Sequence, residues 1–116
     1  MLIVSWQEKA LKMKIEDINW QNGRIRELRF LTEMKESTVI LILELYSDLK
    51  AGYRKRVDIK FQNISLISID FDVKELEANS LDGNIQKGLA DATSIDIEML
   101  QGRLQIAAND IEVVRY

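Results

Sequence analysis

The chain has 116 residues, of which 47% are hydrophobic and 30% charged, and its formal net charge is −3, a composition typical of one globular domain spanning residues 1–116. It contains no cysteine, histidine or proline, which excludes disulfides, thiolate or histidine metal sites, and hydrolase triads built on histidine or cysteine. Apolar runs fall short of the ~20 residues of a membrane-spanning helix. The N-terminus lacks the basic start and cleavage site of a signal peptide, so we expect a cytoplasmic protein without a membrane partner.

The first segment carries two competing patterns. Ser5 and Glu8 have the spacing of a capping box, and Trp6, Ala10 and Met13 would form one stripe of a helix. Leu11, Met13 and Ile15 also alternate with charged residues, which is typical of a strand. We favour a short helix over residues 5–13.

The organising stretch is residues 38–46, TVILILELY, which is apolar on both alternating faces except at Glu44. It predicts a central strand covered on both sides. The tight turn Asn22-Gly23 precedes a second strand at about 24–32. Antiparallel pairing through a turn at 34–37 would set Phe30 opposite Ile40, Leu28 opposite Ile42 and Arg26 opposite Glu44.

Two further strands follow a loop at residues 47–52. Val57, Ile59 and Phe61 alternate with charged residues, and Ile67, Ile69 and Phe71 repeat the pattern in a strand at 66–71. Asp72 and Glu75 have N-cap spacing, which predicts one or two helical turns up to about residue 79, and Asp82-Gly83 is a turn. Residues 84–93 have helical spacing interrupted by Gly88, and helix and strand both stay open there.

The tail predicts a β-meander. Ile95, Ile97 and Met99 alternate with acids, and a two-residue turn at Gln101-Gly102 would pair Met99 with Leu104, Ile97 with Ile106 and Ile95 with Ala108. A last short strand is expected at residues 111–116. The predicted fold is therefore α+β: a mainly antiparallel β-meander that forms a curved sheet or sandwich, with one or two short helices.

Charge divides between the halves of the chain. Residues 1–58 hold eleven Lys/Arg and nine Asp/Glu, a net of +2, whereas residues 59–116 hold five and ten, a net of −5. The acidic half does not suit nucleic acid, whose phosphates require basic surface. It fits a basic protein partner, and more often such a face is solvated and keeps the domain soluble. The candidate partner-binding residues are Asp70, Asp72, Glu75, Glu77 and Asp82.

Other chemistry is less supported. The same acids fail the EF-hand pattern, because Glu75 and Leu81 occupy its glycine and glutamate positions. No glycine-rich phosphate loop is present either. We therefore expect neither a metal nor a cofactor. The triplet Arg54, Lys55 and Arg56 is an alternative anion site, for a small molecule or a lipid head group. More often such a cluster is a solvated strand end.

A family resemblance lies in the run Phe61-Gln-Asn-Ile-Ser…Ile-Asp-Phe-Asp, then Asn84-Ile85, then Ile97…Gln-Gly-Arg-Leu-Gln-Ile-Ala-Ala…Ile111-Glu-Val. In spacing and residue type it resembles small bacterial immunity proteins of polymorphic toxin systems, over about residues 17–116. The resemblance implies a non-catalytic inhibitor that neutralises a toxin by binding it, with no active site. The alternatives are the small-molecule or lipid-head-group binding module and a homodimer joined through an edge strand such as residues 111–116.

Overall fold

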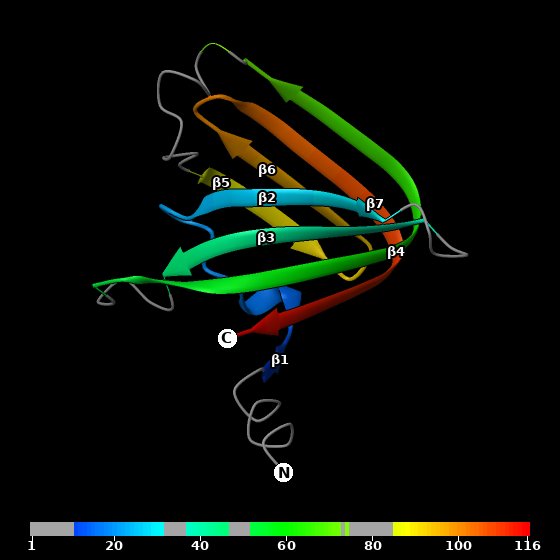
Figure 1. The fold of residues 1–116 in the computed structure, drawn as a ribbon, viewed down its shortest axis with the longest axis horizontal. Helices are drawn as coiled ribbons and strands as arrows, with labels where there is room; N and C mark the ends of the chain where they lie inside the picture. Colours follow the sequence, from blue (N-terminus) through cyan, green and yellow to red (C-terminus); the bar gives the residue numbers. More distant parts are fainter. Residues whose placement is uncertain (1–10, 32–36, 47–51, 73, 75–84) are drawn as a thin grey trace.

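The computed structural model describes residues 11–31, 37–46, 52–72, 74 and 85–116. They form one seven-stranded antiparallel sheet with the order β2-β3-β4-β7-β6-β5, and β1 pairs with β7. The strands are β1 (Leu11–Met13), β2 (Arg24–Leu31), β3 (Thr38–Tyr46), β4 (Arg54–Phe71), β5 (Ile85–Asp91), β6 (Ser94–Met99) and β7 (Gly102–Arg115), and η1 (Ile15–Asp17) is a single 3₁₀ turn (Figure 1). No helix in the described ranges is long and apolar enough to cross a bilayer.

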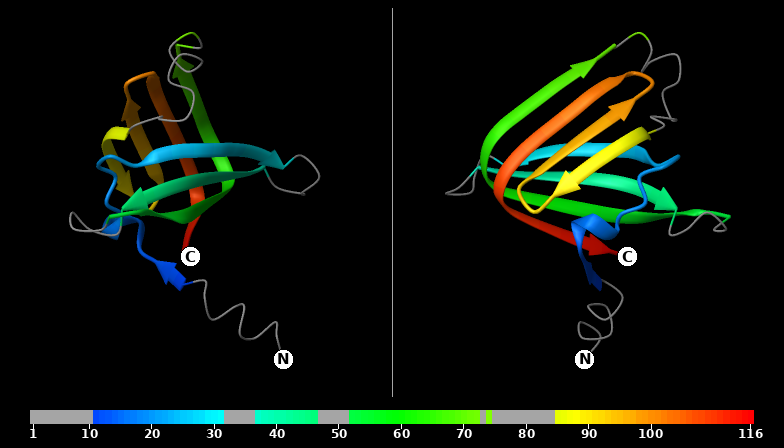
Figure 2. Two further views of the ribbon diagram at one scale, coloured as in Figure 1. Left: turned by 60° about the vertical axis from the view of Figure 1, so that its left-hand side comes forward. Right: turned by 180° about the vertical axis from the view of Figure 1, so that it is seen from behind.

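The sheet is folded over on itself along β4 and β7 (Figures 1 and 2). Both long strands bend at one place, where Asn63 adopts a left-handed backbone with φ 54° and a register shift follows between Ile64 and Leu66. The Asn63 Nδ2 donates a hydrogen bond of 3.0 Å to Asp110 Oδ2 on the opposing strand. The bend produces two layers, one of β2, β3, the first half of β4 and the end of β7, the other of the remaining halves with β6 and β5.

The core lies between these layers. Leu41, Leu43, Ile59 and Phe61 of one layer and Ile97, Leu104 and Ile106 of the other are almost fully buried, as alternation dictates for inward-facing strand positions. Ile15, Ile18 and Trp20 pack into one open side of the fold. Backbone hydrogen bonds from Asn22 N to Ile85 O and from Ile85 N to Gly23 O tie this segment to β5.

The predicted position of the central strand is confirmed, since β3 spans Thr38–Tyr46 and pairs with β2 and β4. The expected cover on both faces is not found among the described residues, because only the row of Val39, Leu41, Leu43 and Leu45 belongs to the core. Its predicted register is wrong by one residue: Phe30 lies opposite Val39 and Leu28 opposite Leu41. The shift between Ile25 and Glu27 adds a residue, so Arg24 is the Cα partner of Glu44. The expected Arg26–Glu44 ion pair nevertheless forms, with 2.9 Å from Nε to Oε1.

The α+β prediction is wrong, because the described residues are nearly all antiparallel strand. Residues 11–13 of the predicted first helix form β1 on β7, and residues 5–10 lie outside the described residues. The open segment 84–93 contains β5. The turns at 34–36 and 82–83, the loop at 47–51 and the helix after Asp72 also fall outside the described ranges, apart from Lys74.

Two predicted chain breaks are bends within continuous strands. The strand expected around Val57, Ile59 and Phe61 and the strand expected at 66–71 are one strand, β4. The second strand of the tail hairpin and the last strand of the tail are also one strand, β7. The hairpin register also differs by two residues, with Met99 opposite Gly102 and Ile97 opposite Leu104, because the turn residues are Leu100 and Gln101. A shift of two keeps every side chain on its predicted face.

Gly88 tests this packing directly. A Cβ added to Gly88 would lie 2.3 Å from Cγ of Trp20, so the glycine in β5 exists to let the indole ring approach the backbone. We expect Gly88→Ala to lower the free energy of unfolding by about 1–3 kcal/mol, the usual cost of overpacking a core. Urea denaturation measures the change.

The matched control is Gly52→Ala, because nothing lies within 4 Å of a Cβ at Gly52. Its denaturation midpoint should match that of the wild type. An unchanged midpoint for Gly88→Ala would contradict the close approach of Trp20 to β5.

Candidate functional site

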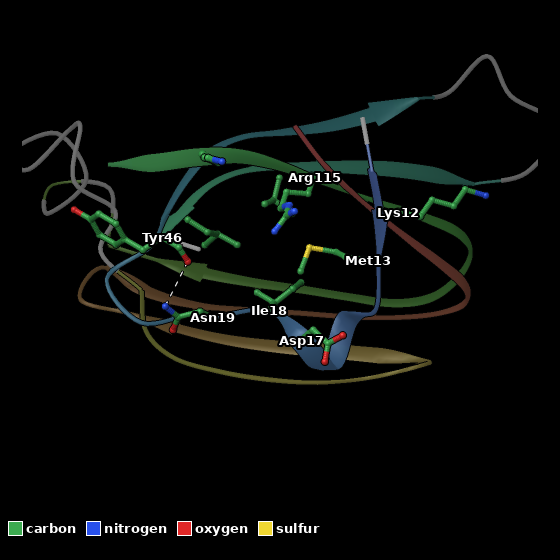
Figure 3. Close-up of a pocket in the computed structure, with 10 residues that line it drawn as sticks. Lys12, Met13, Asp17, Ile18, Asn19, Tyr46 and Arg115 are labelled. Atoms are coloured by element: carbon green, nitrogen blue, oxygen red, sulfur yellow. Dashed lines mark hydrogen bonds between the residues drawn. The ribbon is translucent and has the colours of Figure 1, made fainter. Parts of the chain in front are cut away.

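A pocket of about 370 Å³ lies at the mouth of the folded sheet, beside β1 and η1 (Figure 3). Its walls come from β1, the segment 17–19, the end of β3, the start of β4 and the end of β7. The apolar lining residues are Met13, Ile18, Leu45 and Val57, and the polar ones are Lys12, Asp17, Asn19, Tyr46, Lys55 and Arg115. A volume of this size suits a small organic molecule.

Two of the polar residues occupy inward-facing strand positions. Lys55 is opposite Leu45 on β3, and Arg115 is opposite Val57 on β4, so both share a face with buried apolar side chains. Because residues two apart on a strand share a face, Lys55 and Arg115 are diagonal neighbours on adjacent strands. The row of core-facing side chains thus ends in Lys55 on β4 and in Arg115 on β7.

These two cations lack acidic partners within the described part of the chain. The Lys55 ammonium lies 5.8 Å from the ring centroid of Tyr53 and makes no ion pair there. Arg115 is half-buried, and its side chain has neither a hydrogen bond nor an ion pair with a described residue. Figure 3 shows Arg115 and Met13 directed into the same space, whereas Lys12 extends away from it; Lys12 is paired with Glu112 at 3.5 Å.

The opposite wall is held by Asn19. Its Nδ2 donates a hydrogen bond of 3.4 Å to the carbonyl oxygen of Tyr46, drawn as a dashed line in Figure 3. Its Oδ1 accepts a bond of 3.3 Å from the backbone N–H of Gln21. Buried Ile18 and Trp20 on either side fix this segment against the core, and Asp17 at its start is the carboxylate of the pocket.

The predicted triplet is divided between two faces of β4. Arg54 lies on the outer face, where its Nε donates to the Asn22 carbonyl at 2.9 Å and its guanidinium is 4.9 Å from the Tyr46 ring centroid. Arg56 donates two hydrogen bonds of 2.8 and 2.9 Å to the Asp58 carboxylate, and these bonds raise the pKa of Arg56. Only Lys55 lines the pocket.

Two of the five predicted acids are described. Asp70 and Asp72 are both exposed. An Asp72 carboxylate oxygen accepts a bond of 3.0 Å from the backbone N–H of Lys74, and the Asp72 N–H donates to the Gln101 carbonyl at 2.7 Å. Glu75, Glu77 and Asp82 lie outside the described residues. Within the described part of the chain, no group of three or more His, Cys, Asp and Glu residues is arranged to hold a metal ion.

Sequence reasoning missed Arg115, Met13 and Asn19 as site residues. The signal for Arg115 was its alternation with Ile111 and Val113, which puts a charge at an inward position of the last strand. Lys55 shows the same signal before Val57. Comparison with protein-family models, with characterised proteins and with solved structures finds no match to this chain.

The unpaired cations should cost stability. We expect Arg115→Met to raise the free energy of unfolding at low salt by up to about 1 kcal/mol, because it removes a like-charge neighbour of Lys55 and adds an apolar contact for Met13. Added salt should reduce the difference. Thermal denaturation at two salt concentrations measures it.

Arg103→Met is the matched control, since Arg103 lies on the same strand but on the outer face, ion-paired with Asp96. That variant should be less stable than the wild type. If Arg115→Met also loses stability, Arg115 has a stabilising partner and the pocket is not a site of unbalanced charge.

Proposed function

We propose that the protein is a non-catalytic binding domain that holds a small amphipathic anion in the pocket at the mouth of its folded sheet. The head group, a carboxylate or a phosphate, would lie between Lys55 and Arg115. The apolar part would lie along Met13, Leu45 and Val57. The observation that carries this proposal is the pair of inward-facing cations without an acidic partner among the described residues.

The chemistry of the two cations supports an oxyanion. A guanidinium presents a planar fork of donors that matches a carboxylate or phosphate, while an ammonium adds a compact charge. Both side chains project from the apolar, core-facing side of the sheet, where electrostatic interactions are screened less than in bulk water. The chain has no histidine or cysteine to act on a bound molecule, which supports binding without catalysis.

Calorimetric titration with octyl phosphate, octanoate and the neutral octyl glucoside tests the proposal. We expect the two anions to bind and the glucoside not to bind. Lys55→Gln and Arg115→Gln should each weaken anion binding by about tenfold or more, because a charge-assisted hydrogen bond contributes about 1.5–3 kcal/mol.

The matched controls are Arg54→Gln and Arg56→Gln, which neutralise the neighbours of Lys55 on the outer face of β4. These variants should bind as the wild type does. Equal loss in all four variants would reject the pocket and indicate general charge attraction, and absence of anion binding would reject the proposal.

The immunity-type inhibitor is a second candidate, favoured by the exposed Asp70 and Asp72 next to exposed Leu66 and Ile69 on β4. Apolar side chains bordered by charge are suited to a protein interface. The −5 charge of residues 59–116 fits a basic toxin, and this candidate places the protein in the cytoplasm.

A toxin-like reading frame adjacent in the genome would supply the partner to test. We expect its purified product to bind in a salt-sensitive manner, and joint replacement of Asp70, Glu75, Glu77 and Asp82 by their amides to weaken binding at least tenfold through a slower association rate. Neutralising Asp91 and Asp96, acids on β5 and β6, should have less effect. Unchanged affinity in the fourfold variant would reject the acidic surface.

A further inference from the structure

The second half of β4 has an edge that no described strand covers. β3 pairs with β4 from Arg54 to Gln62 only, and among the described residues no strand pairs with residues 64–71 on the side away from β7. Ser37 Oγ accepts the Ile64 N–H at 3.1 Å, which satisfies the start of this edge. Alternate residues from Leu66 to Phe71 present backbone N–H and C=O groups at the open side.

Large apolar side chains are exposed along this edge. Leu66 on the outer face is 53% exposed, and Ile69 on the core face is 44% exposed although its β7 partner, Leu104, is buried. Ile67 and Phe71 are partly buried and pack against the core. In the described part of the chain, the core therefore reaches this edge without another strand closing it.

The other free strands carry features that oppose edge pairing. β2 presents exposed Arg26, Glu27 and Arg29, and β1 has three residues. β5 contains Lys87 and Gly88 next to a register shift after Ile85. Such charges, irregularities and short lengths are how proteins prevent association of sheet edges. Residues 66–71 follow the bulge of β4 and contain one charge, Asp70.

We propose that residues 66–71 pair with the same residues of a second copy of this chain, antiparallel about a two-fold axis at Ser68. In this register, Ile67 of each copy lies opposite Ile69 of the other on the core face. On the outer face Leu66 lies opposite Asp70, so the two carboxylates do not oppose each other. The segment is thus its own complement, as an isologous interface requires.

The dimer joins the layer formed by the second half of β4, the first half of β7, β6 and β5 to the same layer of the other copy, as one continuous sheet. The interface is remote from the pocket, which lies at the other end of β4 around Lys55 and Val57. This inference therefore stands independently of the proposed ligand. It also differs from an edge at residues 111–116, because β7 is paired on both sides at Val113, Val114 and Arg115.

Sedimentation equilibrium over a concentration series tests the dimer. We expect the wild type to reach twice the monomer mass of 13.4 kDa and Leu66→Lys and Ile69→Lys to stay monomeric with an unchanged circular dichroism spectrum. Leu100→Lys, at a 61% exposed residue in the β6–β7 turn, should dimerise as the wild type does. The proposal is overturned if the wild type is monomeric throughout the series. This holds even if residues 66–71 pair with a strand of a different protein.

The register has its own test, because the chain contains no cysteine. Ser68→Cys should form a covalent dimer under mild oxidation, since directly opposed residues in an antiparallel pair lie within the Cα separation of a disulfide. Gln105→Cys is the control: Gln105 is opposite Ser68 on β7, one strand away from the edge, and should not cross-link. A dimer in which Ser68→Cys does not cross-link places the interface elsewhere and overturns the register.

Discussion

The pairing of β4 with β7 is the constraint on which the rest of the structure depends. These strands run together from Val57–Arg115 to Phe71–Gly102, and they bend together at Asn63 and Asp110. Every other described strand is added to this pair: β3 and β2 extend the sheet from the first half of β4, β6 and β5 extend it from the first half of β7, and β1 pairs with the end of β7. Because the bend brings the apolar faces of the two halves together, a single sheet encloses a core that a flat sheet would leave exposed.

The same bend explains which features were predictable. Alternation identified the inward row of β4 on both sides of Asn63, and the tail hairpin kept its faces despite a shift of two residues. The stretches 62–65, polar except for Ile64, and 109–110 resemble loops in sequence, because Asn and Asp are turn formers. Here they relieve the curvature of strands that continue. The turn preference of these residues is met by the left-handed backbone of Asn63 and the bulge that follows it. Whether the strand ends there or bends and continues depends on the tertiary fold.

Gly88 and Leu11 illustrate a second reason for error. Helical spacing around Gly88 reflects chance placement of Ile85 and Leu89, whereas its strand conformation follows from contact with Trp20, almost seventy positions earlier in sequence. The capping-box pattern near Leu11 likewise competes with pairing to Arg115 of β7. Both strand assignments depend on partners distant in sequence, and helix propensities of a few tenths of a kcal/mol per residue do not outweigh such pairing.

The mouth of the fold shows how the same geometry produces the proposed binding site. Where the two layers diverge, an inward-facing apolar residue would contact water, and a long cationic side chain is a physical solution because its stem covers the core while its charge reaches solvent. Glutamate or glutamine, with a shorter stem, also places a polar group at the solvent. Two cations at diagonal positions, Lys55 and Arg115, repel each other when the pocket is empty and attract an anion placed between them. The positive charge of both side chains, rather than their polarity alone, is therefore the argument for the proposed anionic ligand.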